Sequence, residues 1–384
     1  MTVAPAFNAF NALPIPGHFP RRPCWHTTDT CPSGVKPRGA LMPEDALAHR
    51  ATPSSVAARG MAFLSASKDG MPSALYSFDP SFAETVESGA ARRLLRQRHG
   101  TDIGFDPGDE AFSAMTALAV LPPTVGRAER RFVAEVVRQV EGARRGNRFR
   151  FFPSVPAFAA DTDCTALAAG ALFEHGLISR SQLLATAQDL VKSSARTEDG
   201  MPDGPLRKGV FLVYWDDGVE PGVSPRGRKH DAVVCANILA TLHLAAGHTD
   251  MCLATITYLH SHLMSGDYEK GTRYYPSPAA LVHAAARVCR RCEQCASRLA
   301  SPLAAALRRA EPEGALGLAL LAIAADHLGL ACPAQWREQL AAQQRQDGSW
   351  PASGYFRMGR VPLWFGSPHL TTAFAVRALH GWTP

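Results

Sequence analysis

Two aspartates near the middle of the chain are the residues best suited to proton transfer. Asp161 and Asp163 lie two residues apart in the run DTDCTA, directly before a stretch that is apolar on all sides. A carboxylic acid at the start of a buried helix can be a strong acid that is still protonated at rest, because burial raises its pKa while the helix dipole stabilises its conjugate base. The other interpretation is plain helix capping, since Asp and Thr are preferred before helices whatever the function.

Helices of two kinds alternate from Pro43 onward and would position these acids. The first kind is apolar nearly all round and is predicted at 109–120, 163–173, 232–246, 278–290, 313–328 and 370–380. The second kind is amphipathic and is predicted at 44–67, 128–143, 181–194, 250–264, 296–309 and 334–346. Buried helices that alternate with half-exposed ones indicate an inner ring wrapped by an outer ring. The sequence therefore predicts an all-α fold, an (α/α)6 barrel in a single domain.

The N-termini of the inner helices would gather at one mouth of this barrel, because the inner helices run parallel. The loops that enter these helices are long and rich in Trp, Tyr, Gly and Pro, and they carry a set of aromatic residues: Tyr214, Trp215, Tyr274, Tyr275, Tyr355, Phe356, Trp364 and Phe365. We expect a cavity walled by aromatic rings at this mouth. The alternative is that the rings are only the packed core of loops that cap the barrel.

The bulk composition fits this architecture. The chain has 384 residues, 46% of them hydrophobic and 19% charged, which suits one compact domain with a large core. Residues 1–42 have no helical period and are interpreted as an irregular N-terminal arm, so that the barrel domain is residues 43–384. The formal charge of +6 is modest and the arginines are scattered, which disfavours a nucleic-acid partner.

The compartment is inferred from cysteines and apolar runs. Most of the nine cysteines fall within apolar helical patterns, as thiols in a reducing compartment do. No apolar run approaches the roughly 18–20 residues of a transmembrane span, and the first thirty residues do not resemble a signal peptide. We expect a cytoplasmic protein without a transmembrane segment.

Two short stretches resemble the squalene-hopene and oxidosqualene cyclase superfamily. The run from Gln344 to Trp350, QRQDGSW, resembles the QW repeat, in which Gln and Trp tie the end of an outer helix to the next inner one. The run DTDCTA resembles the DxDD(T)A motif of squalene-hopene and class II diterpene cyclases and the DCTA of oxidosqualene cyclases. This resemblance implies that Asp163 is a general acid that protonates an alkene or epoxide, with Asp161 as its partner and hydrogen bonds from Cys164 and Thr165 in support.

The resemblance implies a class II terpenoid-cyclase-like enzyme, an isomerase or lyase of natural-product biosynthesis that cyclises a small linear isoprenoid or related polyene. A carbocation over an aromatic ring is stabilised by about 0.5–2 kcal/mol per contact, so the eight loop aromatics are candidate substrate-binding residues. Cys164, next to the acid, is a further candidate. His369 and Asp231 each precede an inner helix and are candidates for the terminal base or simply helix caps. Asn237, within an apolar helix, is expected to be a satisfied core amide.

No cofactor and no metal ligand are assigned, although Mg²⁺ would accompany a substrate that carries a diphosphate. The expected partner is a hydrophobic small molecule. Full cyclases place their cavity between two barrels and this chain has length for one, so a homodimer would supply the missing wall unless one barrel suffices for a smaller substrate.

Three alternatives stay open. Protein prenyltransferase β subunits share the barrel and bind zinc through Asp, Cys and His, a set that Asp231, Cys235 and His369 match by residue type but not by spacing. A barrel that binds a lipid or a carrier-protein-tethered acyl chain without catalysis is the second. The third is a metal or cluster at the C-x2-C-x2-C run of Cys289, Cys292 and Cys295, which lacks an obvious fourth ligand.

Overall fold

The structure is a computed structural model, which describes residues 53–121, 127–198, 200–201, 204–220, 222–224, 226–247 and 250–380. The predicted N-terminal arm, 1–42, and the first part of the first predicted outer helix lie outside these residues. Six helices that are buried along almost their whole length form the inner layer: α3 (Phe112–Val120), α5 (Thr162–Glu174), α7 (Ala232–Ala246), α9 (Pro278–Arg291), α11 (Gly314–Leu328) and α13 (Pro368–Leu379). Each matches one predicted inner helix to within three residues at either end.

Six further helices form the outer layer, and each bears out a predicted amphipathic stretch. They are α1 (Pro53–Ala66), α4 (Arg127–Gly142), α6 (Arg180–Val191), α8 (Leu253–Met264), α10 (Glu293–Arg309) and α12 (Ala334–Ala342). The start of α6 shows how local sequence sets these boundaries, because Ser179 and Gln182 form a reciprocal capping box there. A short 3-10 helix, η3 (Asp250–Cys252), precedes α8.

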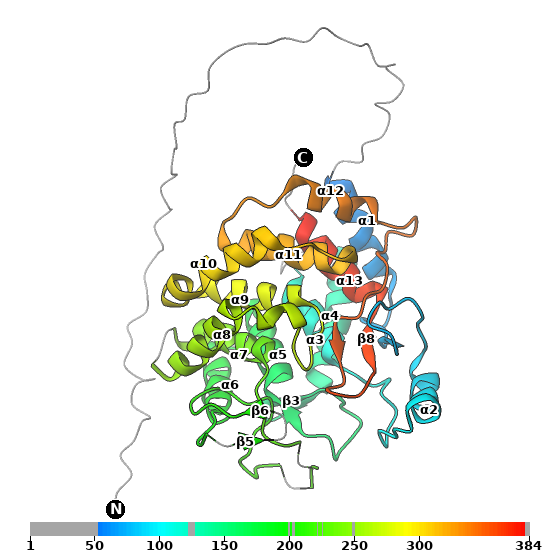
Figure 1. The fold of residues 1–384 in the computed structure, drawn as a ribbon. Helices are drawn as coiled ribbons and strands as arrows, with labels where there is room; N and C mark the ends of the chain where they lie inside the picture. Colours follow the sequence, from blue (N-terminus) through cyan, green and yellow to red (C-terminus); the bar gives the residue numbers. More distant parts are fainter. Residues whose placement is uncertain are drawn as a thin grey trace, which may run out of the picture. The chain divides into compact units, whose positions relative to one another are not determined.

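The inner helices close into a ring. Each packs against the next in chain order, and α13 packs against α3 to complete the circle. Each outer helix packs against an inner neighbour, and α1, drawn in blue in Figure 1, lies beside the red α13 from the other end of the described chain. The architecture is therefore the predicted all-α (α/α)6 barrel.

The QW run joins three helices at the point where the ring closes. The Trp350 indole is fully buried, and its Nε1 donates to the carbonyl of Leu340 in α12 at 2.6 Å. The amide of Gln344 donates to the carbonyl of Val56 in α1 at 2.9 Å, while the backbone N–H of Trp350 donates to Oγ1 of Thr372 in α13 at 3.1 Å. The motif thus ties an outer helix to the next inner helix, as its resemblance predicts, and also to the first helix described.

Several short elements at the mouth were not predicted. Helix α2 (Ser88–His99) is exposed along most of its length. Strand β1 (Leu75–Ser77) pairs antiparallel with β8 (Trp364–Gly366), which pairs with β7 (Phe356–Arg357). A second small sheet contains β2 (Arg144–Arg145), β3 (Arg148–Arg150) and β4 (Ala160–Asp161). A third sheet has two strands, β5 (Gly200–Met201) and β6 (Gly204–Pro205). A second 3-10 segment, η4 (Asp267–Lys270), follows α8.

None of the helices among the described residues is both long enough and apolar enough to cross a bilayer.

Candidate active site

A cavity of about 380 Å³ lies at the N-terminal ends of the inner helices and is called the mouth cavity here. Its wall is mainly aromatic and aliphatic, and most of the rings come from the loops that enter the inner helices. The lining rings are Phe105, Phe112, Phe151, Phe152, Phe158, Tyr214, Tyr274, Tyr275, Phe356 and Phe365. Neighbouring rings meet mostly edge to face, as with Phe112 on Phe356 at 5.0 Å between centroids. The predicted aromatic cavity is therefore present.

Asp163 reaches the mouth cavity from the first turn of α5 and is 7% exposed. Its Oδ2 accepts a short hydrogen bond from the hydroxyl of Tyr275, and its Oδ1 accepts one from Nδ2 of Asn237 at 2.7 Å. Both donors are buried side chains that come from other parts of the ring. The carboxyl group is therefore held in one orientation, with donors on both of its oxygens.

A buried arginine holds Asn237 in place. Nη2 of Arg287, in α9, donates to Oδ1 of Asn237 in α7 at 2.8 Å, which leaves the NH₂ end of the amide to face Asp163. Burial lowers the pKa of Arg287 to about 10, so the guanidinium is still protonated at neutral pH. A positive charge is thus connected to the carboxyl group through one amide, and the expectation that Asn237 is a satisfied core amide is confirmed.

Burial is the main influence on the acidity of Asp163. It raises the pKa of the carboxyl group to about 7 against the opposing hydrogen bond from Tyr275, and the negative charges of Asp161 and Asp231 act in the same direction as burial. The group is therefore largely protonated below neutral pH, while its two donors stabilise the carboxylate that forms when the proton leaves. This is the combination required of a strong acid that is loaded at rest.

Asp161 caps α5 and also faces the mouth cavity. Its Oδ1 accepts from the backbone N–H of Cys164 at 2.7 Å, whereas its Oδ2 is buried with no hydrogen-bond partner. Burial raises the pKa of Asp161 to about 6. The hydroxyl of Thr165 donates to the backbone carbonyl of Asp161 at 2.7 Å, so it supports the turn and not the carboxyl group of Asp163. Capping and a role in tuning Asp163 therefore coexist in this residue.

Basic side chains also line the mouth cavity, a feature that the sequence analysis missed. They are Arg226, Lys229, Arg273, Arg357 and Arg360. The guanidinium of Arg226 lies over the Phe158 ring, with 3.7 Å from Cζ to the centroid, and Nε of Arg357 donates to the carbonyl of Arg273 at 3.1 Å. The cavity therefore combines an apolar wall with several positive charges.

The predicted substrate-binding residues divide into two groups. Tyr214, Tyr274, Tyr275, Phe356 and Phe365 line the mouth cavity, but Cys164, Trp215, Tyr355 and Trp364 do not. Cys164 is fully buried in α5. Trp215 instead donates from Nε1 to the carbonyl of Asp189 at 2.9 Å and packs beneath Arg148, and Tyr355 lies behind Tyr275 at 5.4 Å between ring centroids.

The two candidates for the terminal base are not placed in the cavity wall. Asp231 caps α7, accepting from the N–H of Val233 at 2.9 Å, and its second oxygen accepts from the N–H of Tyr274. The His369 ring packs on Phe63 at 4.5 Å between centroids, and burial lowers the pKa of its imidazole to about 4. The alternative of helix capping thus describes Asp231.

The same contacts argue against the prenyltransferase-like zinc set. Cys235 donates from Sγ to the carbonyl of Phe211 at 3.4 Å, Asp231 uses both carboxylate oxygens for backbone N–H groups, and His369 faces an aromatic ring. The three side chains do not form a group of potential ligands in the part of the chain that the structure describes.

Sequence reasoning overlooked the rings that precede Asp161. Phe151, Phe152 and Phe158 all line the cavity, and the run FRFFPSVPAF immediately before the acids was the available signal. The roles of Tyr275 and Arg287 as partners of the acid and its amide could not be read from the sequence, because they depend on which helices adjoin α5 and α7.

Known proteins resemble this chain in fold and, over part of its length, in sequence. No protein-family model matches the chain. The drimenol cyclase drtB of Aspergillus calidoustus is 29% identical over 260 residues, which cover 64% of this chain and 43% of that protein, so the chain spans less than half the length of this relative. The type II terpene cyclase MstE from Scytonema superposes with a TM-score of 0.56 at 13% identity, over 85% of this chain and 96% of that one. A protein from Actinoplanes superposes with a TM-score of 0.53 at 16% identity, over 85% and 98%. The chain therefore has the fold of a type II terpene cyclase.

Proposed function

We propose that the protein is a class II terpenoid-cyclase-like enzyme that protonates a linear isoprenoid and guides the resulting cation to a cyclic product. The observation that carries this proposal is Asp163, a buried carboxylic acid with a pKa of about 7 at the wall of an aromatic cavity. The curated relative named for a cyclisation supports the same activity.

In the first step the O–H bond of Asp163 breaks. With a terminal alkene, the π bond takes the proton and a C–H bond forms; with an epoxide, an O–H bond forms on the ring oxygen as a ring C–O bond breaks, and either route leaves a carbocation. The next π bond attacks the cation, so that C–C bonds form in sequence, and loss of a proton or capture by water ends the cascade. The Asp163 carboxylate accepts hydrogen bonds from Tyr275 and Asn237 as it forms. The rings of the mouth cavity stabilise successive cations by about 0.5–2 kcal/mol per contact.

We further propose that the substrate carries an anionic head group, such as a diphosphate. The five basic side chains at the mouth cavity would hold this group while the hydrocarbon tail extends to Asp163. Mg²⁺ would then enter with the substrate rather than as a resident cofactor. We also propose a cytoplasmic location, which fluorescence microscopy of a tagged full chain would test.

The experiment is a mass-spectrometric comparison of wild type and Asp163→Asn, incubated with matched panels of linear prenyl diphosphates, prenyl alcohols and epoxyprenyl compounds. We expect a cyclised product with wild type and none with Asp163→Asn, and we expect the diphosphates to be converted in preference to the alcohols. Thr241→Val is the control, because Thr241 is likewise a buried polar residue of an inner helix, α7, but donates to the carbonyl of Ala166 and does not contact the acid.

The outcomes separate the alternatives. Equal conversion of alcohols and diphosphates would overturn the anionic head group only. If wild type converts no compound but binds one of them, the barrel is a binding protein for lipids or carrier-tethered chains. Product formed equally by Asp163→Asn would place the acid elsewhere.

A further inference from the structure

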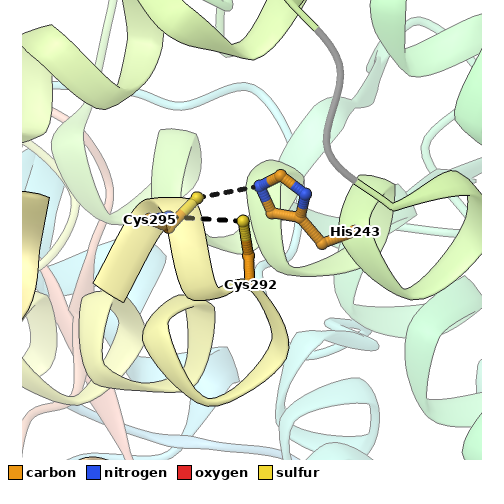
Figure 2. Close-up of side chains that lie close together, drawn as sticks. All are labelled: His243, Cys292 and Cys295. Atoms are coloured by element: carbon orange, nitrogen blue, oxygen red, sulfur yellow. Dashed lines mark hydrogen bonds between the residues drawn. The ribbon is translucent and has the colours of Figure 1, made fainter. Parts of the chain in front are cut away.

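A second cluster of chemically active side chains lies at the other end of the inner helices. His243 is in the last turn of α7, Cys292 is the N-cap of α10, and Cys295 is in the first turn of α10. All three are buried, and Figure 2 shows their ligand atoms pointing toward one another. His243 is twelve residues beyond Asp231 along α7, or about 18 Å at 1.5 Å per residue, so this cluster is separate from the mouth cavity.

The separations within the cluster suit one metal ion. One ligand atom from each of the three residues lies within 4.8 Å of the others, and Sγ of Cys295 is 3.1 Å from Nε2 of His243. In a tetrahedral zinc site, with Zn–S near 2.3 Å and Zn–N near 2.0 Å, ligand atoms are about 3.5–3.8 Å apart. The 3.1 Å contact is shorter than this spacing and the 4.8 Å limit is longer, so movements of about 1 Å would complete the geometry.

The histidine is oriented as a metal ligand would be. Its Nδ1 lies 3.1 Å from the carbonyl of Gly247, a contact in which Nδ1 is the donor because a carbonyl can only accept. The proton on Nδ1 leaves the lone pair of Nε2 directed at the two sulfurs. Metal-bound histidines are commonly held in this way by a backbone carbonyl.

The sulfurs are arranged for the same purpose. Sγ of Cys292 accepts from the backbone N–H of Cys295 at 3.3 Å, an N–H···S contact that stabilises a thiolate at a helix start. Two further cysteines, Cys252 and Cys289, act on the Cys295 thiol through their charges, although neither sulfur lies within 4.8 Å of all three ligand atoms. Both are buried, and they belong to η3 and to the last turn of α9.

We propose that His243, Cys292 and Cys295 bind one structural Zn²⁺ ion, with Cys252 or Cys289 as the fourth ligand. Soft thiolates with one imidazole are the ligands that tetrahedral zinc prefers. The three ligand atoms are too close together for a [4Fe–4S] cluster, in which each cysteine binds a different iron. Zinc would join the end of α7 to the start of α10, on the side of the barrel opposite the acid.

The test is the metal content of the full chain, expressed without a polyhistidine tag in zinc-supplemented medium and measured by inductively coupled plasma mass spectrometry. We expect about one zinc per chain, by analogy with closed structural sites. Cys292→Ser and Cys295→Ser should lose most of this zinc. Cys332→Ser is the matched control. Because Cys332 is a half-buried thiol outside the cluster, this variant should retain its zinc.

The variants Cys252→Ser and Cys289→Ser identify the fourth ligand, because only the variant that removes this ligand should lose zinc. If both variants retain zinc, the fourth ligand is a water molecule. Cobalt titration of chelator-treated wild type gives a readout that does not depend on the folding of any variant, because a tetrahedral cobalt–thiolate site has an intense visible spectrum. Chelation should also lower the thermal unfolding midpoint.

Wild type that contains no zinc and takes up neither Zn²⁺ nor Co²⁺ would overturn the proposal and leave the cluster as a thiol–imidazole core contact. None of these readouts requires cyclase activity.

Discussion

Nδ2 of Asn237 donates to Oδ1 of Asp163 at 2.7 Å from the interior of the neighbouring inner helix. The amide cannot turn around without losing its bond from Arg287. Asn237 is therefore a positioning residue that keeps a donor on the conjugate base of the proposed acid.

Replacing Asn237 by Leu should weaken the acid. Without the amide donor the Asp163 carboxylate is less stable, so the pKa of Asp163 rises and kcat/KM falls by about tenfold or more, the equivalent of 1.4 kcal/mol or more. The pH profile of kcat/KM measures both effects. Thr241→Val, one turn further along α7, should lower the stability without shifting the pH profile of kcat/KM. If this control shifts the profile by the same amount, the effect of Asn237→Leu is a general structural one.

Tyr275→Phe should act on the other oxygen. The ring that lines the mouth cavity is kept and only the hydroxyl that donates to Oδ2 of Asp163 is removed. We expect kcat to fall by about 10- to 100-fold, corresponding to one buried hydrogen bond to a charged group. Tyr355→Phe is the control, because Tyr355 adjoins Tyr275 but makes no bond to the acid that the structure records; if the two variants lose the same activity, the hydroxyl of Tyr275 has no special role.

The activity should decrease as the pH rises through about 7. The proton donor must be protonated, and burial raises the pKa of Asp163 to about 7 from its usual 3.8. The reactive form therefore predominates below this pH and kcat/KM should fall about tenfold per pH unit above it. A profile measured from pH 5 to 9 checks this, and activity that increases toward pH 9 would indicate a base instead of an acid.

The stability of the protein should respond to the same ionisation. Because the folded-state pKa of Asp163 is raised above the unfolded value, its contribution is fully present below about pH 4 and is lost as the pH rises through 7. Asp163→Asn removes this dependence. The variant should therefore gain on wild type by up to about 4 kcal/mol in the free energy of unfolding between pH 4 and 8. Urea unfolding at several pH values measures the gap, and a constant gap would contradict the assignment.

His369→Gln should leave the chemistry intact. The imidazole packs on Phe63 and is absent from the wall of the mouth cavity, so it is poorly placed to accept the final proton. We expect kcat/KM within about threefold of wild type, with a small loss of stability from the ring contact. A new product distribution, seen by mass spectrometry, would restore the residue as the terminal base.

The sequence was sufficient to predict the barrel because its inner helices are apolar nearly all round. A helix such as Ala232–Ala246 has no polar side to confuse with a surface helix, so its position was predicted to the residue. Asp161 and Asp163 were located by the same logic, since both sit where an apolar run begins. Helix α2 was missed because it is charged and mostly exposed, and the strands because they are two or three residues long.

The parts of the site that could not be predicted depend on packing between distant segments. His369 and Trp364 were assigned to the mouth from their position in the chain, but His369 lies in the first turn of α13, Trp364 lies in β8, and neither side chain lines the cavity. The His243 contact with Cys295 joins residues 52 positions apart, so the missing partner of the cysteine run was not visible in the sequence.

The packing of α13 against both α1 and α3 has a consequence for how the chain folds. Residues near position 370 must find partners more than 250 positions earlier before the ring is closed. Until they do, the apolar flanks of α3 and α11 lack their neighbour, and a ribosome-bound chain would expose them to solvent. The newly synthesised chain should therefore become resistant to proteases slowly and in one late step. Its yield should depend on the supply of chaperones.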